Sequence, residues 1–197
     1  MEEEAEPEMD IATVLIVGLL IVILLFVLYV ISARNRIIRL DNTIDNSWSQ
    51  IDVQLKRRAD LIPNLVETVK GYAAHEKGVL EGVTQARAGL MTAKTPEDAN
   101  AANNMLTQAL GRLFAVAENY PQLKANENFL QLQDELTHTE NKVSFARQHY
   151  NDTVLEYNNA VTTFPGSIFA GSLGKSRKGM LEIPPADREV PKVSFGA

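Results

Sequence analysis

The stretch from Ile44 to Tyr72, IDNSWSQIDVQLKRRADLIPNLVETVKGY, decides the fold of this chain. Its large apolar side chains recur at alternating intervals of four and three residues, which places them on one face of a long helix. Two residues interrupt that face: Arg58 introduces a charge, and Pro63 cannot donate an amide hydrogen. Because the spacing stays in phase across Pro63, we expect a kink there in a continuous helix. The apolar residues are Ile44, Trp48, Ile51, Leu55, Ile62, Leu65, Val69 and Tyr72.

Upstream of this stretch, residues 11–31 (IATVLIVGLLIVILLFVLYVI) carry no charge. As a helix they cover about 30 Å, the thickness of the hydrocarbon core of a bilayer. A cleaved signal peptide would begin with basic residues and have a shorter apolar core, whereas six of the first ten residues are acidic. The sequence therefore predicts an acidic N-terminal tail over residues 1–10 and a transmembrane helix over residues 11–32, retained as a single-pass anchor in the cell membrane.

Charge is divided unevenly along the chain. The formal charge of -6 lies on the first ten residues, because the remainder has 19 basic and 19 acidic residues. A neutral body argues against nucleic acid as a partner. Arg34, Arg36 and Arg39 follow the apolar segment and no basic residue precedes it, so the positive-inside rule places the N-terminus outside and the rest of the chain in the cytoplasm. The alternative is an arginine belt that contacts lipid headgroups in either orientation.

The remaining pattern predicts further helices and no strands. No stop signal follows Ala33, so the membrane helix is expected to continue into the soluble part. Thr95–Pro96 resembles a helix start, Asn126 a second cap, and Phe164–Gly166 a stop. We expect an all-α protein with an antiparallel bundle of three to four helices over residues 33–165, four if Pro63 divides the first helix.

The C-terminal segment, residues 166–197, is rich in Gly, Ser and Pro and predicts a mostly irregular tail. Ile168–Ala170 forms an apolar spot within it, which we expect to fold onto a neighbouring surface.

Three charged residues occupy apolar positions of the helical pattern: Arg58 in the first helix, and Glu140 and Arg147 in the last. Antiparallel packing of the two helices would bring them together in the core. We interpret them as a structural polar network that fixes register, and a ligand or catalytic site is the alternative. Asn151 and Asn158, one heptad apart, are interpreted in the same way, as polar edges of a helix contact.

Metal and cofactor chemistry find little support in the sequence. Glu135 and His138 form one Glu-x-x-His motif, but a di-iron bundle needs two such motifs and two more glutamates. The chain has no cysteine, so thiolate ligands, disulfides and cysteine nucleophiles are excluded. Phosphate-binding glycine loops and serine-nucleophile elbows are also missing. We predict no metal, no cofactor and no catalytic residue.

Several long motifs resemble the LemA family of bacterial membrane proteins. They are residues 48–76 (WSQIDVQLKRRADLIPNLVETVKGYAAHE), 120–152 (YPQLKANENFLQLQDELTHTENKVSFARQHYND), 157–158 (YN), 164–171 (FPGSIFAG) and 191–195 (PKVSF). The resemblance implies a membrane anchor followed by an elongated four-helix bundle, with no established enzyme activity. It also implies a role in membrane organisation, since some relatives help to form magnetosome membranes, or in quality control beside membrane metalloproteases.

The sequence thus favours a non-enzymatic, membrane-anchored helical scaffold that associates with itself or with partner membrane proteins. Two alternatives stay open. One is a hydrolase that works through Glu140, Arg147 and Arg58, and the other is a ligand or lipid sensor with a cavity at the Pro63 kink.

Overall fold

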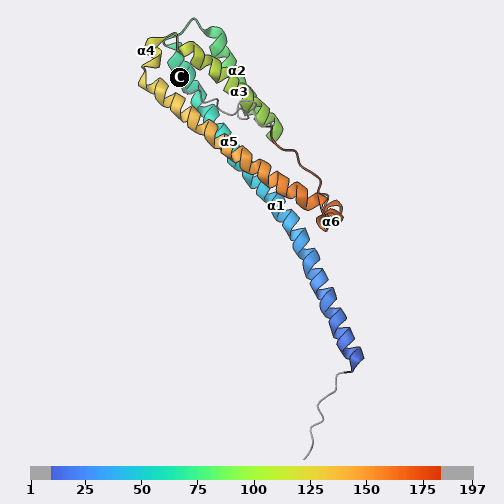
Figure 1. Cartoon of the computed structure of the whole chain (residues 1–197). Helices are drawn as coiled ribbons and strands as arrows, with labels where there is room; N and C mark the ends of the chain where they lie inside the picture. The colour runs from blue at the N-terminus through green and yellow to red at the C-terminus, as the bar shows by residue number, and fades with distance from the viewer. Residues whose placement is uncertain (1–9, 183–197) are drawn as a thin grey trace, which may run out of the picture. The chain divides into compact units, whose positions relative to one another are not determined.

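The computed structural model describes residues 10–182. Most of the predicted acidic tail, and the C-terminal tail beyond residue 182, lie outside the described residues. Every regular element in the described range is a helix, so the predicted all-α class is confirmed (Figure 1). The helices are α1 Ile11–Lys70, α2 Lys77–Thr92, α3 Pro96–Ala117, α4 Pro121–Lys124, α5 Glu127–Thr162 and α6 Gly166–Ser172.

The described residues fall into two compact units. The first unit contains residues 10–42 and 156–178, and the second contains residues 43–155 and 179–182. Helices α1 and α5 each contribute to both units, so each unit is described by itself.

Helix α1 is a single element of 60 residues, which confirms that the apolar segment continues into the soluble part without a break. Nearly all large side chains between Ile11 and Ile31 are exposed, as expected of a helix surrounded by lipid. From Ile37 onward one face of α1 is buried, and it follows the predicted spacing through Ile44, Ile51 and Leu55.

The first two bundle helices separate at residues 71–76 and not at Pro63. Pro63 is exposed, and α1 continues past it to Lys70. Gly71, a weak helix former, follows, and the amide of Tyr72 donates to the carbonyl of Val69 at 3.0 Å in a tight turn. Tyr72 therefore leaves the buried face of the helix, and it is 41% exposed. The kink at Pro63 stays a prediction.

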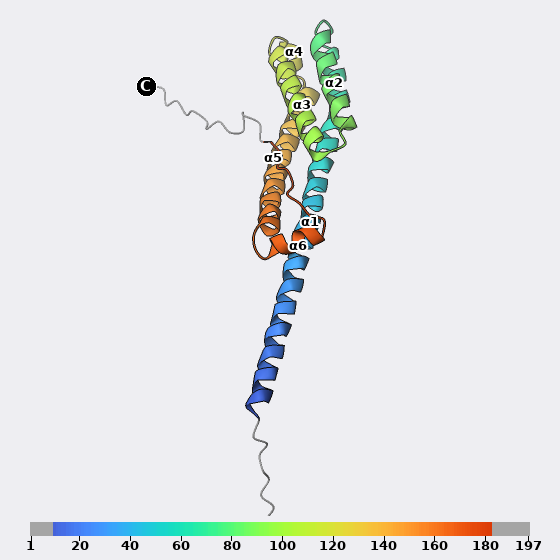
Figure 2. The same cartoon turned by 90° about the vertical axis from the view of Figure 1, so that its right-hand side faces the viewer.

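The second unit is an antiparallel arrangement of α1, α2, α3 and α5 (Figures 1 and 2). Early residues of α1 meet late residues of α5: the rings of Trp48 and Tyr150 are 6.5 Å apart. Helix α3 packs on α5 through Phe114 and Phe129, whose ring centroids are 6.1 Å apart. The core that these helices enclose is aliphatic, and its most buried members include Ile51, Ile62, Leu65, Val83, Leu106, Leu113, Val143 and Val154.

Two predicted helix starts are confirmed by their capping bonds. Thr95 Oγ1 accepts from the amide of Asp98 at 3.1 Å, which caps α3 ahead of Pro96. Asn126 Oδ1 accepts from the amide of Phe129 at 3.0 Å at the start of α5. The caps separate α3 from α5 and leave only the four-residue α4 between them.

In the first unit, the tail predicted as mostly irregular begins instead with the short helix α6. Ala170 is buried, as expected of the apolar spot, whereas Ile168 is 63% exposed. Past residue 172 the chain is irregular until residue 182, with Leu181 of the second unit buried. A short apolar segment that buries Ala170 therefore gains enough packing to form a helix despite its glycines.

Candidate functional site

A buried arginine lies at the centre of the second unit. Arg58 of α1 is 3% exposed, and its Nη1 atom donates to Asn103 Oδ1 at 2.5 Å and to Thr107 Oγ1 at 3.0 Å, both on α3. The same nitrogen forms an ion pair with Glu140 of α5. Arg147, also buried, acts on Arg58 electrostatically. The structure thus brings Arg58 and Glu140 into contact, with Arg147 close by.

The electrostatics of this arginine cluster follow from its burial. Burial lowers the pKa of the Arg58 guanidinium, the Glu140 charge opposes that effect, and the Arg147 charge adds to it. The pKa stays below its ordinary value, yet a guanidinium remains charged at neutral pH. Among the described residues, Arg58 Nε and Asn103 Nδ2 are buried without a hydrogen-bond partner. The cluster joins three helices, but Arg58 is closed to a substrate.

Sequence reasoning missed Asn103 and Thr107. Only Asn103 carried a signal, because it lies on the side of α3 that also buries Leu106 and Leu110, whereas Thr107 is exposed. A polar residue on such a face indicates a polar partner in the core.

The Glu-x-x-His motif lies on the surface of the second unit. Glu135 accepts from Arg57 at 2.8 Å, and His138 lies 3.6 Å from Asp134 with most of its side chain exposed. Among the described residues no group of three or more His, Asp or Glu side chains is close enough to hold a metal ion.

The first unit holds a second polar cluster. Asp41 of α1, 9% exposed, pairs with Lys175 and, at 2.7 Å, with Lys178. Burial acts to raise the pKa of Asp41, but the hydrogen bonds from the two lysines outweigh burial and hold the pKa below its ordinary value. The ammonium group of Lys178 also lies 5.6 Å from the centroid of the Tyr157 ring. These contacts attach the segment after α6 to α1 and α5 within this unit.

The two asparagines expected at a helix contact instead bind the backbone of the segment after α6. In the first unit, Asn158 Nδ2 donates to the Lys178 carbonyl at 2.9 Å and Asn158 Oδ1 accepts from the Lys178 amide at 2.8 Å. In the second unit, Asn151 makes the same pair of bonds with Leu181, at 2.9 and 2.8 Å. Each carboxamide therefore provides a donor for the carbonyl and an acceptor for the amide of a single residue, so both backbone groups of that residue are hydrogen-bonded.

Replacing Asn151 with alanine should release Leu181 from the second unit. Two hydrogen bonds are lost, each contributing about 0.5–1.5 kcal/mol, and the backbone groups of Leu181 lose their partners. We expect faster hydrogen exchange at the Leu181 amide, measured by mass spectrometry on the full chain. Asn151→Asp keeps the acceptor and loses the donor, so its effect should be intermediate. Asn141→Ala, an exposed site on the same helix, is the control, and equal effects at both positions would contradict the assignment.

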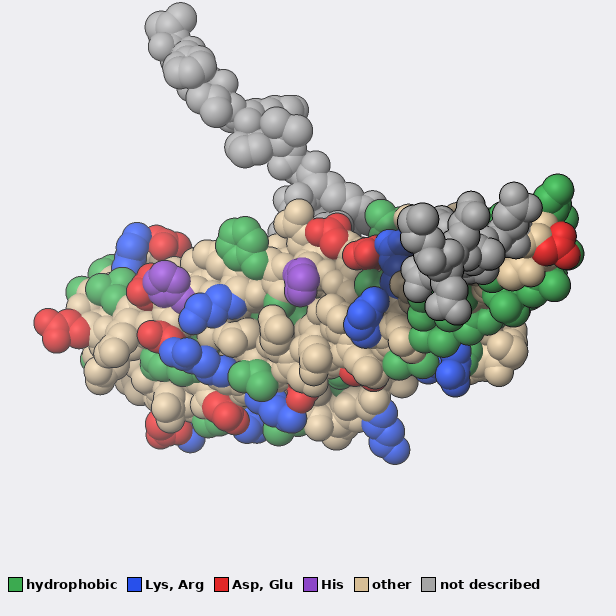
Figure 3. All heavy atoms as spheres, turned by 90° about the horizontal axis from the view of Figure 1, so that it is seen from below, with side chains coloured by type: hydrophobic (Ala, Val, Ile, Leu, Met, Phe, Trp, Pro, Cys, Tyr) green, Lys and Arg blue, Asp and Glu red, His purple; other side chains and the backbone are tan. Residues whose placement is uncertain are grey.

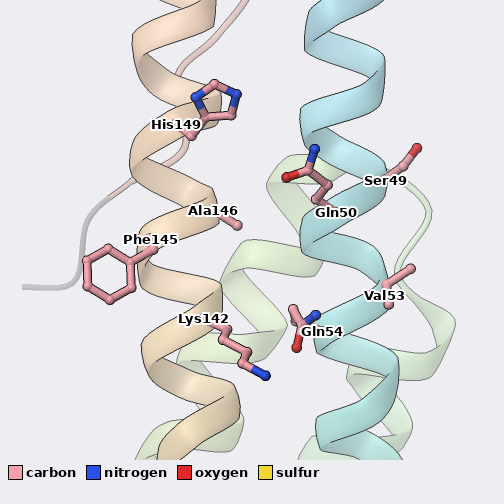
Figure 4. Close-up of a pocket in the computed structure, with 8 residues that line it drawn as sticks. All are labelled: Ser49, Gln50, Val53, Gln54, Lys142, Phe145, Ala146 and His149. Carbon is pink, nitrogen blue, oxygen red and sulfur yellow. The ribbon is translucent and has the colours of Figure 1, made fainter.

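An open groove runs between α1 and α5 in the second unit (Figure 4). Its volume is about 590 Å³, and two large apolar side chains lie at its edges, Phe145 at 72% and Val53 at 59% exposure. Lys142 and His149 add polar atoms on the α5 side, and Gln50 and Gln54 on the α1 side. The groove has the composition of a surface that contacts another protein: apolar in part and edged by polar groups.

The three arginines that follow the apolar segment are residues of α1 in the first unit. Arg36 donates to Glu156 of α5 at 3.1 Å, and both side chains are largely exposed. Arg34 and Arg39 are exposed as well. Elsewhere, on the face shown in Figure 3, basic and acidic side chains are interspersed without a broad patch of one sign.

Comparison with known proteins adds one family and several distant relatives. The model of the LemA family matches residues 47–195. Protein LemA of Metamycoplasma hominis is 26% identical over 144 residues, which cover 71% of this chain and 64% of that protein. Magnetosome protein MamQ 2 of Paramagnetospirillum magneticum is 22% identical over 187 residues, 82% of this chain and 69% of the relative. Magnetosome protein MamQ of Magnetospirillum gryphiswaldense is 24% identical over 164 residues, 70% and 60% respectively. This chain spans about two thirds of the length of these relatives.

Proposed function

The chain belongs to the LemA family, and from that premise we propose that it is a non-enzymatic scaffold, anchored in the cell membrane, that self-associates. The same scaffold would also bind partner membrane proteins, in membrane organisation or in quality control. Two of the relatives are named as magnetosome proteins, which supports the membrane-organising form.

Helix α1 supports the anchoring part of this proposal. It is the one described helix long and apolar enough to cross a bilayer, and its apolar half is not buried by the rest of the protein. The exposed arginines after Ile31 favour an orientation with the N-terminus outside and the helical bundle that follows the membrane segment in the cytoplasm.

The groove between α1 and α5 is the feature that supports the proposed self-association. An exposed phenylalanine and an exposed valine face solvent there beside polar side chains, most of them uncharged and one of them the cationic Lys142. All copies of an anchored protein share one membrane and one orientation, so their effective concentration is high and a modest apolar contact suffices. A second copy is therefore the occupant that we propose for this groove.

Cysteine cross-linking tests the self-association directly, because the chain contains no cysteine of its own. We expect Phe145→Cys to form a disulfide-linked dimer in native membranes under mild oxidation. Met105→Cys, 64% exposed on α3, is the matched control and should remain monomeric. Equal cross-linking at both positions, or none at position 145, would overturn the proposed contact. In the latter case, photo-cross-linking from position 145 to another membrane protein would favour the partner-binding form.

A further inference from the structure

The turn between α5 and α6, taken as residues 163–168 so that it includes the start of α6, exposes two large apolar side chains. Phe164 is 76% exposed and Ile168 is 63% exposed, although Gly166 and Ala170 between and beside them are buried. Isolated apolar side chains on a protein surface are ordinary. What distinguishes Phe164 and Ile168 is their position beside the end of the apolar segment of α1.

Within the first unit, the turn lies beside the end of the apolar segment. A hollow of about 200 Å³ is lined by residues 164–166 of the turn and by the α1 residues Tyr29, Ser32 and Ala33. Gly166 is packed so closely that a Cβ atom there would lie 3.5 Å from Ile37 Cδ1. Both views of the fold show α6 next to α1 (Figures 1 and 2).

The depth of this turn follows from the geometry of α1. The uncharged run ends at Ile31, and residues 29–37 of a helix span about 12 Å. The turn therefore lies where the hydrocarbon core of the membrane gives way to the headgroups. Tyr29, an aromatic residue of the kind enriched at that boundary, lines the same hollow.

Charge around the turn matches an anionic lipid surface. No acidic residue occurs from Tyr157 to Leu181, and that segment carries Lys175, Arg177 and Lys178. The α1 part of the unit adds three arginines after the apolar run. Of the acids near this end of the unit, Asp41 is neutralised by two lysines and Glu156 by Arg36. The surface that flanks the exposed pair is therefore positive, which favours anionic headgroups.

We propose that the turn between α5 and α6 is a second membrane contact, in which Phe164 and Ile168 enter the interface of the bilayer that α1 crosses. The flanking arginines then contact anionic headgroups, as at an interfacial amphipathic segment. This inference rests on the proposed membrane anchoring and is independent of self-association. Its consequence is that the first unit contacts the membrane at two points, through α1 and through this turn, which restricts the tilt of the unit in the bilayer.

Nitroxide labelling at single cysteines tests this contact in the full-length protein. Phe164→Cys and Ile168→Cys change exposed side chains, and Met105→Cys at 64% exposure is the control in the second unit. Each labelled variant is reconstituted in lipid nanodiscs that contain phosphatidylglycerol and phosphatidylcholine. Collision rates are then measured with oxygen, which concentrates in the bilayer, and with a water-soluble nickel chelate.

We expect the ratio of oxygen to nickel collisions to be several-fold higher at positions 164 and 168 than at position 105. A ratio at 164 and 168 equal to that at 105 would place the turn in water and overturn the contact. Removing phosphatidylglycerol should reduce the ratio at 164, and Arg177→Gln should reduce that lipid dependence. An unchanged ratio without phosphatidylglycerol would overturn the headgroup part. Anchoring is read separately, from retention of each variant in the nanodisc, so failure of the turn contact is distinguishable from failure of the anchor.

Discussion

Replacing Glu140 with alanine is expected to lower the free energy of unfolding of the second unit by about 3–5 kcal/mol, because breaking a buried pair leaves an uncompensated charge. The charge left behind is Arg58, which is 3% exposed and has Arg147 nearby with the same sign. Asn103 and Thr107 still accept hydrogen bonds from Arg58 but supply no negative charge. Since Glu140 itself is partly exposed, water entering the vacated space will bring the loss toward the lower end of that range.

Urea unfolding of the full chain in a fixed detergent measures this loss. The only tryptophan, Trp48, lies in the second unit against Tyr150, so its fluorescence reports the unfolding of that unit. Glu135→Ala is the matched control: Glu135 on the same helix pairs with Arg57 on α1, but both are substantially exposed. Removing an exposed pair should cost no more than about 1 kcal/mol.

A second variant separates a structural role for this cluster from a catalytic one. Arg58→Met combined with Glu140→Leu removes both charges together, and such replacements recover much of the stability that the single change loses. A hydrolase that works through Glu140 would show the opposite pattern: normal stability in Glu140→Ala and loss of a measurable turnover. Equal losses for Glu140→Ala and Glu135→Ala would contradict the structural interpretation.

Part of this cluster could be predicted from the sequence, and part could not. A charge at an apolar position of a helical repeat is visible in the sequence, and antiparallel packing then pairs Arg58 with Glu140. The contribution of α3 to the cluster was harder to predict, because Asn103 and Thr107 do not stand out in a helix rich in alanine and asparagine. Which side of α3 faces Arg58 depends on the rotation of α3 within the bundle, and helical spacing alone does not set that rotation.

The asparagines of α5 illustrate a different limit. Their heptad spacing is visible, and it suggested contact with another helix. The actual partners are the backbone groups of Lys178 and Leu181, which are the same for every residue type and leave no mark in the sequence. The short helix α6 was missed for a related reason, because glycine and serine predict a loop unless packing such as that of Ala170 intervenes.

Gly166→Ala is expected to displace the turn between α5 and α6 and to destabilise the first unit by about 1–3 kcal/mol, the usual cost of overpacking. An added Cβ atom would lie 1.9 Å from the carbonyl oxygen of Ala160 and 3.1 Å from its carbonyl carbon. Both atoms belong to the backbone of α5, so no side-chain rotation relieves the contact. The backbone itself has to move.

Gly171→Ala, five residues along the same short helix, should have the opposite sign. Nothing lies within 4 Å of an added Cβ atom there, so alanine should stabilise α6 by about 0.5–1 kcal/mol through its higher helix propensity. Hydrogen exchange at the amide of Ser167, which donates to the Thr163 carbonyl at 2.9 Å, measures both effects. Exchange should accelerate in Gly166→Ala and slow in Gly171→Ala, and slower exchange in both would refute the packing argument. Because Gly166 also holds the turn against Ile37, its replacement should move a nitroxide at position 164 relative to the membrane, which links the packing of one glycine to the depth of the proposed lipid contact.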